Sequence, residues 1–192
     1  MAEIKSALEM ALERAERFGR ASKEEMAEAR HREQGQRLAV NFLKGEVDLE
    51  KELQAAPPEA LPALKAGIKE VLLRNVALPR NGDPDPRLSL ALEGLLLAAT
   101  NPKAMARFKS EVEQLMTNFV QVRNNAFQQL KARFSATLGD YARALEMQLR
   151  QKVRLEVEHL PQFQEEWRKF LGQLQEQFEP LLEELKSRMK GA

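Results

Sequence analysis

The stretch PKAMARFKSEVEQLMTNFVQVRNNAFQQLKARF, residues 102–134, decides the fold of this chain. Its apolar residues recur every three or four positions, which is the spacing of one face of an α-helix. The spacing is first that of a heptad seam and shifts toward repeated fours from Ala126. No proline follows until Pro161, so the pattern predicts a long helix over about residues 102–159 with one apolar stripe: Met105, Phe108, Val112, Leu115, Phe119, Val122, Ala126, Leu130, Phe134, Leu138, Tyr141, Leu145, Leu149 and Val153.

The weak point of this helix is SATLGD, residues 135–140, where Gly139 lowers the helix propensity. The stripe stays in phase from Leu138 to Tyr141, which favours a continuous helix. About 57 residues would span ~85 Å at 1.5 Å per residue. A compact chain of this size has a radius of gyration of roughly 16 Å. The exposed seam of so long a helix therefore needs another helix to cover it.

A return helix over about residues 161–190 is the natural cover. The short break at Leu160-Pro161 predicts an antiparallel C-terminal helical hairpin. The charges agree, because residues 102–159 carry a net +4 and residues 160–192 a net −1. Pro180 should kink the return helix. Its apolar pattern consists of Phe163, Trp167, Phe170, Leu174, Phe178, Leu181, Leu185 and Met189.

The N-terminal residues 1–56 read as a separate helical arm. An apolar stripe from Ile4 to Phe18 predicts an amphipathic helix that Gly19 ends. The S-x-x-E pattern of Ser22 and Glu25 is typical of a capping box and predicts the start of a second helix. That helix is polar, since residues 23–37 contain only one large apolar side chain, and a polar connector follows it.

Residues 57–192 are expected to form the core of an elongated all-α bundle. Pro57 and Pro58 suit the start of a third helix. PRNGDPDP, residues 79–86, is the strongest loop signal, and Asp85 before Pro86 is typical of an N-cap followed by proline. The fourth helix, about residues 88–99, is apolar nearly all round, so we expect it to be the most buried element.

Composition and the motifs that the sequence lacks limit the classes of protein to which this chain could belong. Aromatic residues are 6%, cysteine is absent and the formal net charge is +1. The N-terminus lacks the apolar core of a signal peptide, and the longest apolar run is about a dozen residues, against roughly 20 for a membrane span. The sequence contains no G-x-S-x-G motif and no phosphate-binding glycine loop. These features predict a cytoplasmic, non-enzymatic protein without a cofactor.

Metal binding is the first alternative. Both histidines follow a glutamate by three positions, as Glu28–His31 and Glu156–His159. Ferritin-like bundles use such pairs together with further inward glutamates. The neighbours of the first pair are mostly charged, and the second pair precedes Pro161 at a helix end. The favoured interpretation of Glu28–His31 is therefore a solvated helix surface, and that of Glu156–His159 is a helix C-terminus.

Two further alternatives are nucleic-acid and lipid binding. Seven basic and two acidic residues lie between Arg123 and Arg154, which could form a basic stripe. The basic residues are scattered around the helix, however, and the nearby phenylalanines have core spacing. The last helix is amphipathic with Trp167, but its polar face is rich in glutamate, which disfavours an anionic lipid or granule surface.

The favoured interpretation is a helical protein–protein interaction or scaffold protein that self-associates, as a homodimer or another homo-oligomer. A long seam with too little chain to cover it, a polar arm and the absence of a catalytic pattern support it. Neutral amides near the seam, including Asn118, Asn125 and Gln129, could fix the register of such an assembly. The expected contact residues are Phe108, Leu115, Phe119, Leu130, Phe163, Trp167 and Phe170.

Overall fold

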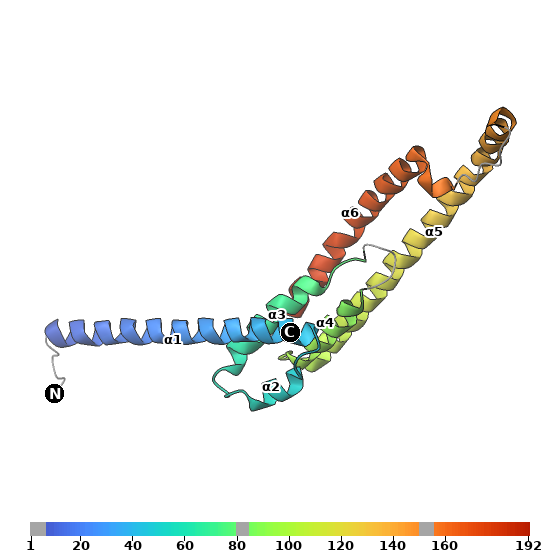
Figure 1. Ribbon diagram of the computed structural model, residues 1–192. Coiled ribbons are helices and arrows are strands. Elements are labelled where there is room, and N and C mark those ends of the chain that lie inside the picture. The colour runs from blue at the N-terminus through green and yellow to red at the C-terminus, as the bar shows by residue number, and fades with distance from the viewer. Residues whose placement is uncertain (1–6, 80–84, 150–155) are drawn as a thin grey trace. The chain divides into compact units, whose positions relative to one another are not determined.

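A computed structural model describes residues 7–79, 85–149 and 156–192 of the chain (Figure 1). The all-α class is confirmed, because these three ranges contain helices and no strand. The chain divides into two compact units, Met1–Asn75 with Ser89–Pro102, and Val76–Leu88 with Lys103–Ala192. The helices are α1 (Ala7–Leu43), α2 (Leu49–Ala55), α3 (Leu61–Asn75), α4 (Pro86–Leu97), α5 (Pro102–Leu149), the 3₁₀ turn η1 (Val157–His159) and α6 (Pro161–Gly191).

The first unit is organised by a close crossing of α1 over α3. A Cβ atom placed on Gly35 would lie 2.0 Å from the carbonyl oxygen of Leu64, and one on Gly67 would lie 2.0 Å from that of Arg32. Ordinary side chains keep packed helix axes 8–10 Å apart. Only the two glycines let these backbones touch, so this crossing fixes where α1 meets α3.

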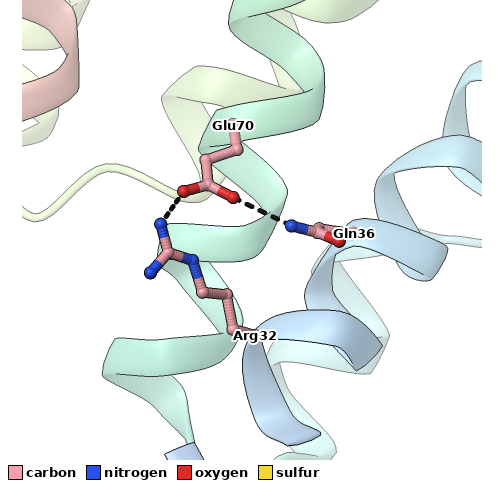
Figure 2. Close-up of polar contacts among 3 residues, drawn as sticks. All are labelled: Arg32, Gln36 and Glu70. Atoms are coloured by element: carbon pink, nitrogen blue, oxygen red, sulfur yellow. Dashed lines mark hydrogen bonds and ion pairs between the residues drawn. The ribbon is translucent and has the colours of Figure 1, made fainter. Parts of the chain in front are cut away.

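Polar side chains hold the same crossing from outside. Figure 2 shows both carboxylate oxygens of Glu70 on α3 engaged by α1. Arg32 pairs with Oε1, and the side-chain amide of Gln36 donates to Oε2 at 2.9 Å. Two donors on one carboxylate constrain both the rotation and the sliding of α1, whereas a single exposed ion pair would contribute little.

Apolar side chains from all four helices fill the first unit. Gly94 on α4 admits the ring of Phe42, because a Cβ there would lie 2.8 Å from its Cε1 atom and 2.6 Å from Leu72 Cδ1. The short helix α2 is capped by Asp48, whose side chain accepts from the backbone N–H of Lys51 at 3.3 Å. The buried side chains of this unit include Ala39, Leu49, Ile68, Leu72, Ala91, Leu92, Leu95 and Ala98.

Two lysines one turn apart on α3 have different surroundings. Lys65 Nζ donates to the carbonyl oxygen of Ala99 at 3.3 Å, just beyond the end of α4, where a cation suits the helix dipole. Lys69 is buried, and this burial, together with the nearby charge of Lys65, lowers the pKa of Lys69. Lys69 therefore costs folding free energy while it stays charged.

The second unit contains the predicted antiparallel hairpin of α5 and α6, which lie side by side (Figure 1). Phe119 meets Phe178 at a ring-centroid distance of 5.3 Å, and Phe134 meets Phe163 at 5.7 Å. Positions on α6 rise as positions on α5 fall, which fixes the direction. The buried side chains of the hairpin include Met105, Val112, Met116, Phe119, Val157, Phe163, Leu174, Leu182, Leu185 and Met189.

Three of the predicted helix starts at prolines are confirmed. The helices α4, α5 and α6 begin at Pro86, Pro102 and Pro161. Asp85 caps α4 as expected, since its Oδ1 accepts from the backbone N–H of Arg87 at 2.9 Å. Proline suits a first helical position because its missing N–H has no intrahelical partner there. Continuity of α5 through Gly139 is confirmed too.

The prediction of two N-terminal helices was wrong. The structure has one helix, α1, that passes through both Gly19 and Ser22. A single glycine costs only about 1 kcal/mol inside a helix, and the residues around it are strong helix formers. The capping-box pattern did not act as a start because the preceding turn was already helical. Pro57 and Pro58 were also misplaced as a start, since α3 begins at Leu61, and α2 was not predicted.

The predicted C-terminal end of the long helix was also wrong. The assigned helix α5 ends at Leu149, residues 150–155 lie outside the described residues, and Glu156 has extended φ and ψ angles of −97° and 132°. A short 3₁₀ turn, η1, then leads into α6. The residue before a proline avoids the α-helical region, which explains why the backbone is extended at Leu160 before Pro161.

Candidate functional site: the open face of the hairpin

A cluster of aromatic rings joins the middle of α5 to α6. Trp167 packs its ring against the edge of Phe127 at 5.1 Å between centroids, and it stacks beside Phe170 at 5.6 Å. The guanidinium of Arg123 lies 5.4 Å from the Trp167 ring centroid. Such edge and cation contacts add to the stabilisation from area burial. The three rings are only half-buried, so part of this aromatic surface stays open to solvent.

A shallow groove of about 410 Å³ opens beside this cluster. Four of its seven lining residues are apolar or aromatic, and the ion pair between Arg133 and Glu166 also lines it. An apolar floor with a few polar groups is the common composition of binding surfaces. The residues that line the groove are Ala126, Gln129, Leu130, Arg133, Glu166, Trp167 and Phe170.

Large apolar side chains stay exposed along the same hairpin. Val122 on α5 has 43% of its surface exposed and Leu181 on α6 has 49%. Other apolar side chains of the two helices face inward, since Met116 is 2% exposed and Leu182 is 3% exposed. The predicted apolar stripes are therefore wrong at Val122 on α5 and at Leu181 on α6, where Leu182 fills the core instead.

Two ion pairs cross the hairpin on this side. Arg133 on α5 pairs with Glu166 on α6, and Glu111 on α5 pairs with Arg188 on α6 at 3.3 Å. All four side chains are about half exposed. The guanidinium of Arg188 also lies 4.7 Å from the centroid of the Phe108 ring. Neither pair was predicted from the sequence, although opposite charges at matching positions of an antiparallel hairpin are a signal for such pairs.

Another ion pair ties the connecting turn to the long helix. Lys131 pairs with Glu158 in η1, and this hydrogen bond lowers the pKa of the Glu158 carboxyl. The pairing holds the turn against α5 at neutral pH. Its contribution is present above the usual glutamate pKa and is lost as the pH falls through the lowered value.

The predicted contact residues fall into two groups. Phe119 and Phe163 are only 1% and 2% exposed, so they hold the hairpin together and have little surface left for a partner. The other five are half-buried: Phe108, Leu115, Leu130, Trp167 and Phe170. Contact of these five with a partner stays a prediction.

The two Glu–His pairs belong to different units of the chain. Glu28 and His31 lie on α1 in the first unit, where Glu28 is exposed and His31 Nδ1 lies 3.1 Å from Gln34 Oε1. Glu156 and His159 were expected at the C-terminal end of the long helix, but the backbone is extended at Glu156, and His159 lies in η1. Across the described ranges, no group of three or more histidines, aspartates or glutamates could hold a metal ion.

Two of the three basic side chains that the structure describes in the basic stripe have acidic partners. Lys131 and Arg133 pair with glutamates, and Arg123 lies over an aromatic ring. Nucleic-acid binding depends on unpaired cations that can displace counterions from phosphates. The remaining basic side chains of the stripe lie outside those that the structure describes: Arg143, Arg150, Lys152 and Arg154. Among the described residues, no helix is long and apolar enough to cross a membrane.

The fold and this face define an all-α chain with an antiparallel helical hairpin that carries exposed apolar side chains. The chain belongs to a family of unknown function, DUF6657, whose model matches residues 50–191. The match includes the whole of α3, α4, α5 and α6, and it leaves α1 outside. No curated protein and no solved structure matches the chain.

Proposed function

We propose that this protein is a non-enzymatic helical interaction or scaffold protein of the cytoplasm that self-associates through the open face of its hairpin. One observation carries the proposal. Val122 and Leu181 stay exposed on the hairpin that carries the aromatic groove at Trp167, although α5 and α6 bury other apolar side chains well.

The physical reason is that two helices cannot cover each other fully. Each helix of a hairpin buries one stripe against its partner, and a third or fourth helix normally covers the flanks. Exposed apolar surface that runs along two helices, bordered by polar groups, is typical of an interaction site. The rigid ring of Trp167 suits such contacts because it loses little conformational entropy on binding.

Light scattering after size-exclusion chromatography, combined with small-angle X-ray scattering, tests the proposal. The molar mass should be a multiple of the chain mass of 21.9 kDa and should fall on dilution. The Trp167→Ala variant should weaken association, because it removes the largest ring at the groove. A protein that stays monomeric and compact at high concentration would contradict self-association.

A further inference from the structure

The open face carries two stripes with the same spacing. On α5 the stripe is Glu111, Leu115, Asn118, Val122, Ala126, Gln129 and Arg133, and on α6 it is Glu166, Phe170, Gln173, Gln177, Leu181, Glu184 and Arg188. Both follow the spacing 4-3-4-4-3-4, which reads the same in both directions. A helix has 3.6 residues per turn, so each stripe stays on one face over its whole length.

Each stripe carries a glutamate at one end and an arginine at the other, at equal distances from its central residue. Glu111 and Arg133 lie 11 positions on either side of Val122, and Glu166 and Arg188 lie 11 positions on either side of Gln177. One end of the face therefore has arginine on α5 and glutamate on α6, and the other end has the reverse. Between the ends the α5 stripe is uncharged, and Glu184 is the only other charge on the α6 stripe.

We infer that this face binds the same face of a second copy of the chain, about a twofold axis that passes near Val122 and Gln177. This inference rests on the self-association proposed above and adds its geometry. The axis sets α5 antiparallel on α5 and α6 antiparallel on α6 of the second copy. Each Arg133 then meets a Glu111, and each Glu166 meets an Arg188, so all four charged corners are complementary.

The size of the face agrees with a stable dimer. Each stripe spans 22 positions, or ~33 Å, and two adjacent helices are roughly 20 Å wide. The area is then about 650 Å² per copy and ~1,300 Å² in total, which lies at the lower end of specific interfaces. Val122, which lies on the axis, would contact Val122 of the second copy, and the neutral amides Asn118 and Gln129 would lie to either side of it.

The decisive variant exchanges the charges at one end, Arg133→Glu together with Glu166→Arg. The ion pair within the chain survives in reversed form, so the hairpin should keep its helicity and melting temperature. In the proposed dimer, however, four contacts between the copies change from attraction to repulsion. We expect the dimer dissociation constant to rise roughly 10- to 100-fold at low salt, and less at high salt.

The quadruple variant restores the pattern. Adding Glu111→Arg and Arg188→Glu makes opposite charges meet again across the axis, so the dissociation constant should return to within about threefold of the original. Analytical ultracentrifugation of the three proteins measures this, with circular dichroism as the check on folding.

Each outcome decides between the claims. A weakened double variant with a restored quadruple variant supports the twofold register. A dimer that is unaffected by the double exchange, or that the quadruple exchange does not restore, overturns the register and leaves self-association standing. A chain that is monomeric before any substitution overturns both.

Discussion

The crossing of α1 over α3 gives the sharpest prediction about stability. In Gly67→Ala, the added Cβ would lie 2.0 Å from the Arg32 carbonyl oxygen, 2.9 Å from its carbon and 3.1 Å from the Gln36 nitrogen. All three atoms belong to the backbone of α1, so no side-chain rotation relieves the clash. The helices must separate, which loosens the packing around Ile68 and the contacts of Glu70.

The change in the free energy of unfolding of Gly67→Ala is the sum of two opposing effects. Overpacking a tight contact costs about 1–3 kcal/mol, and a clash with rigid backbone belongs at the upper end or beyond. Alanine gains about 1 kcal/mol over glycine inside a helix. We therefore expect Gly67→Ala to lower the free energy of unfolding by about 2 kcal/mol.

A second glycine-to-alanine variant separates the effect of the clash from the effect of helix propensity. Gly172 on α6 is also helical, but a Cβ there would meet nothing within 4 Å. Gly172→Ala should raise the free energy of unfolding by about 0.5–1 kcal/mol. Urea unfolding followed by circular dichroism at 222 nm compares the two variants, with Trp167 fluorescence as a separate probe of the hairpin. A Gly67→Ala protein as stable as the original would refute the reasoning.

Three further predictions concern single side chains. Lys69→Met should stabilise the protein by about 0.5–1 kcal/mol at pH 7. Because the folded state lowers the pKa of Lys69, the original protein should gain stability as the pH rises from that lowered pKa toward 10.5, and thermal melts of the methionine variant should lack this rise. Phe119→Ala should cost about 3–5 kcal/mol in urea titrations, because it leaves a cavity beside Phe178; a loss under 1 kcal/mol would argue against the hairpin core. Pro180→Ala should raise stability by about 1–3 kcal/mol and protect the new amide from hydrogen exchange, since Pro180 is exposed and lacks the N–H that its turn needs; an unprotected amide would count against this.

Much of the fold could be predicted because the positions of the prolines and the spacing of the apolar residues indicated the same helices. Proline at a first helical position marks a start by its own geometry, as at Pro86, Pro102 and Pro161. The apolar stripe across Gly139 outweighed a single weak residue. In both cases the deciding forces act within a few turns of one helix, and the sequence of that helix displays them directly.

The errors arose where one local signal was taken alone. Gly19 and the pair Ser22 and Glu25 resemble a stop and a start, yet a helix tolerates each of them internally. The end of α5 was set too late because Pro161 marks where α6 begins and not where α5 stops. A proline fixes its own turn, but the chain before it can unwind several residues earlier.

The candidate site was predicted only in part. Phe170 and Trp167 follow from helical spacing, but Leu181 and Leu182 are equally apolar, and only the packing against α5 decides which one is buried. The ion pairs at the ends of the face depend on the register between two helices. That register is set by ring contacts such as Phe119 with Phe178, which the spacing within one helix does not show.

The central claim is that the open face of the hairpin joins two copies of the chain, and Val122→Glu tests it most directly. Val40→Glu on α1 is the matched control, because Val40 and Val122 have 41% and 43% of their surfaces exposed and both lie on helices. Light scattering should give twice 21.9 kDa for the original and for Val40→Glu, and 21.9 kDa for Val122→Glu. One common molar mass for all three proteins would contradict the claim.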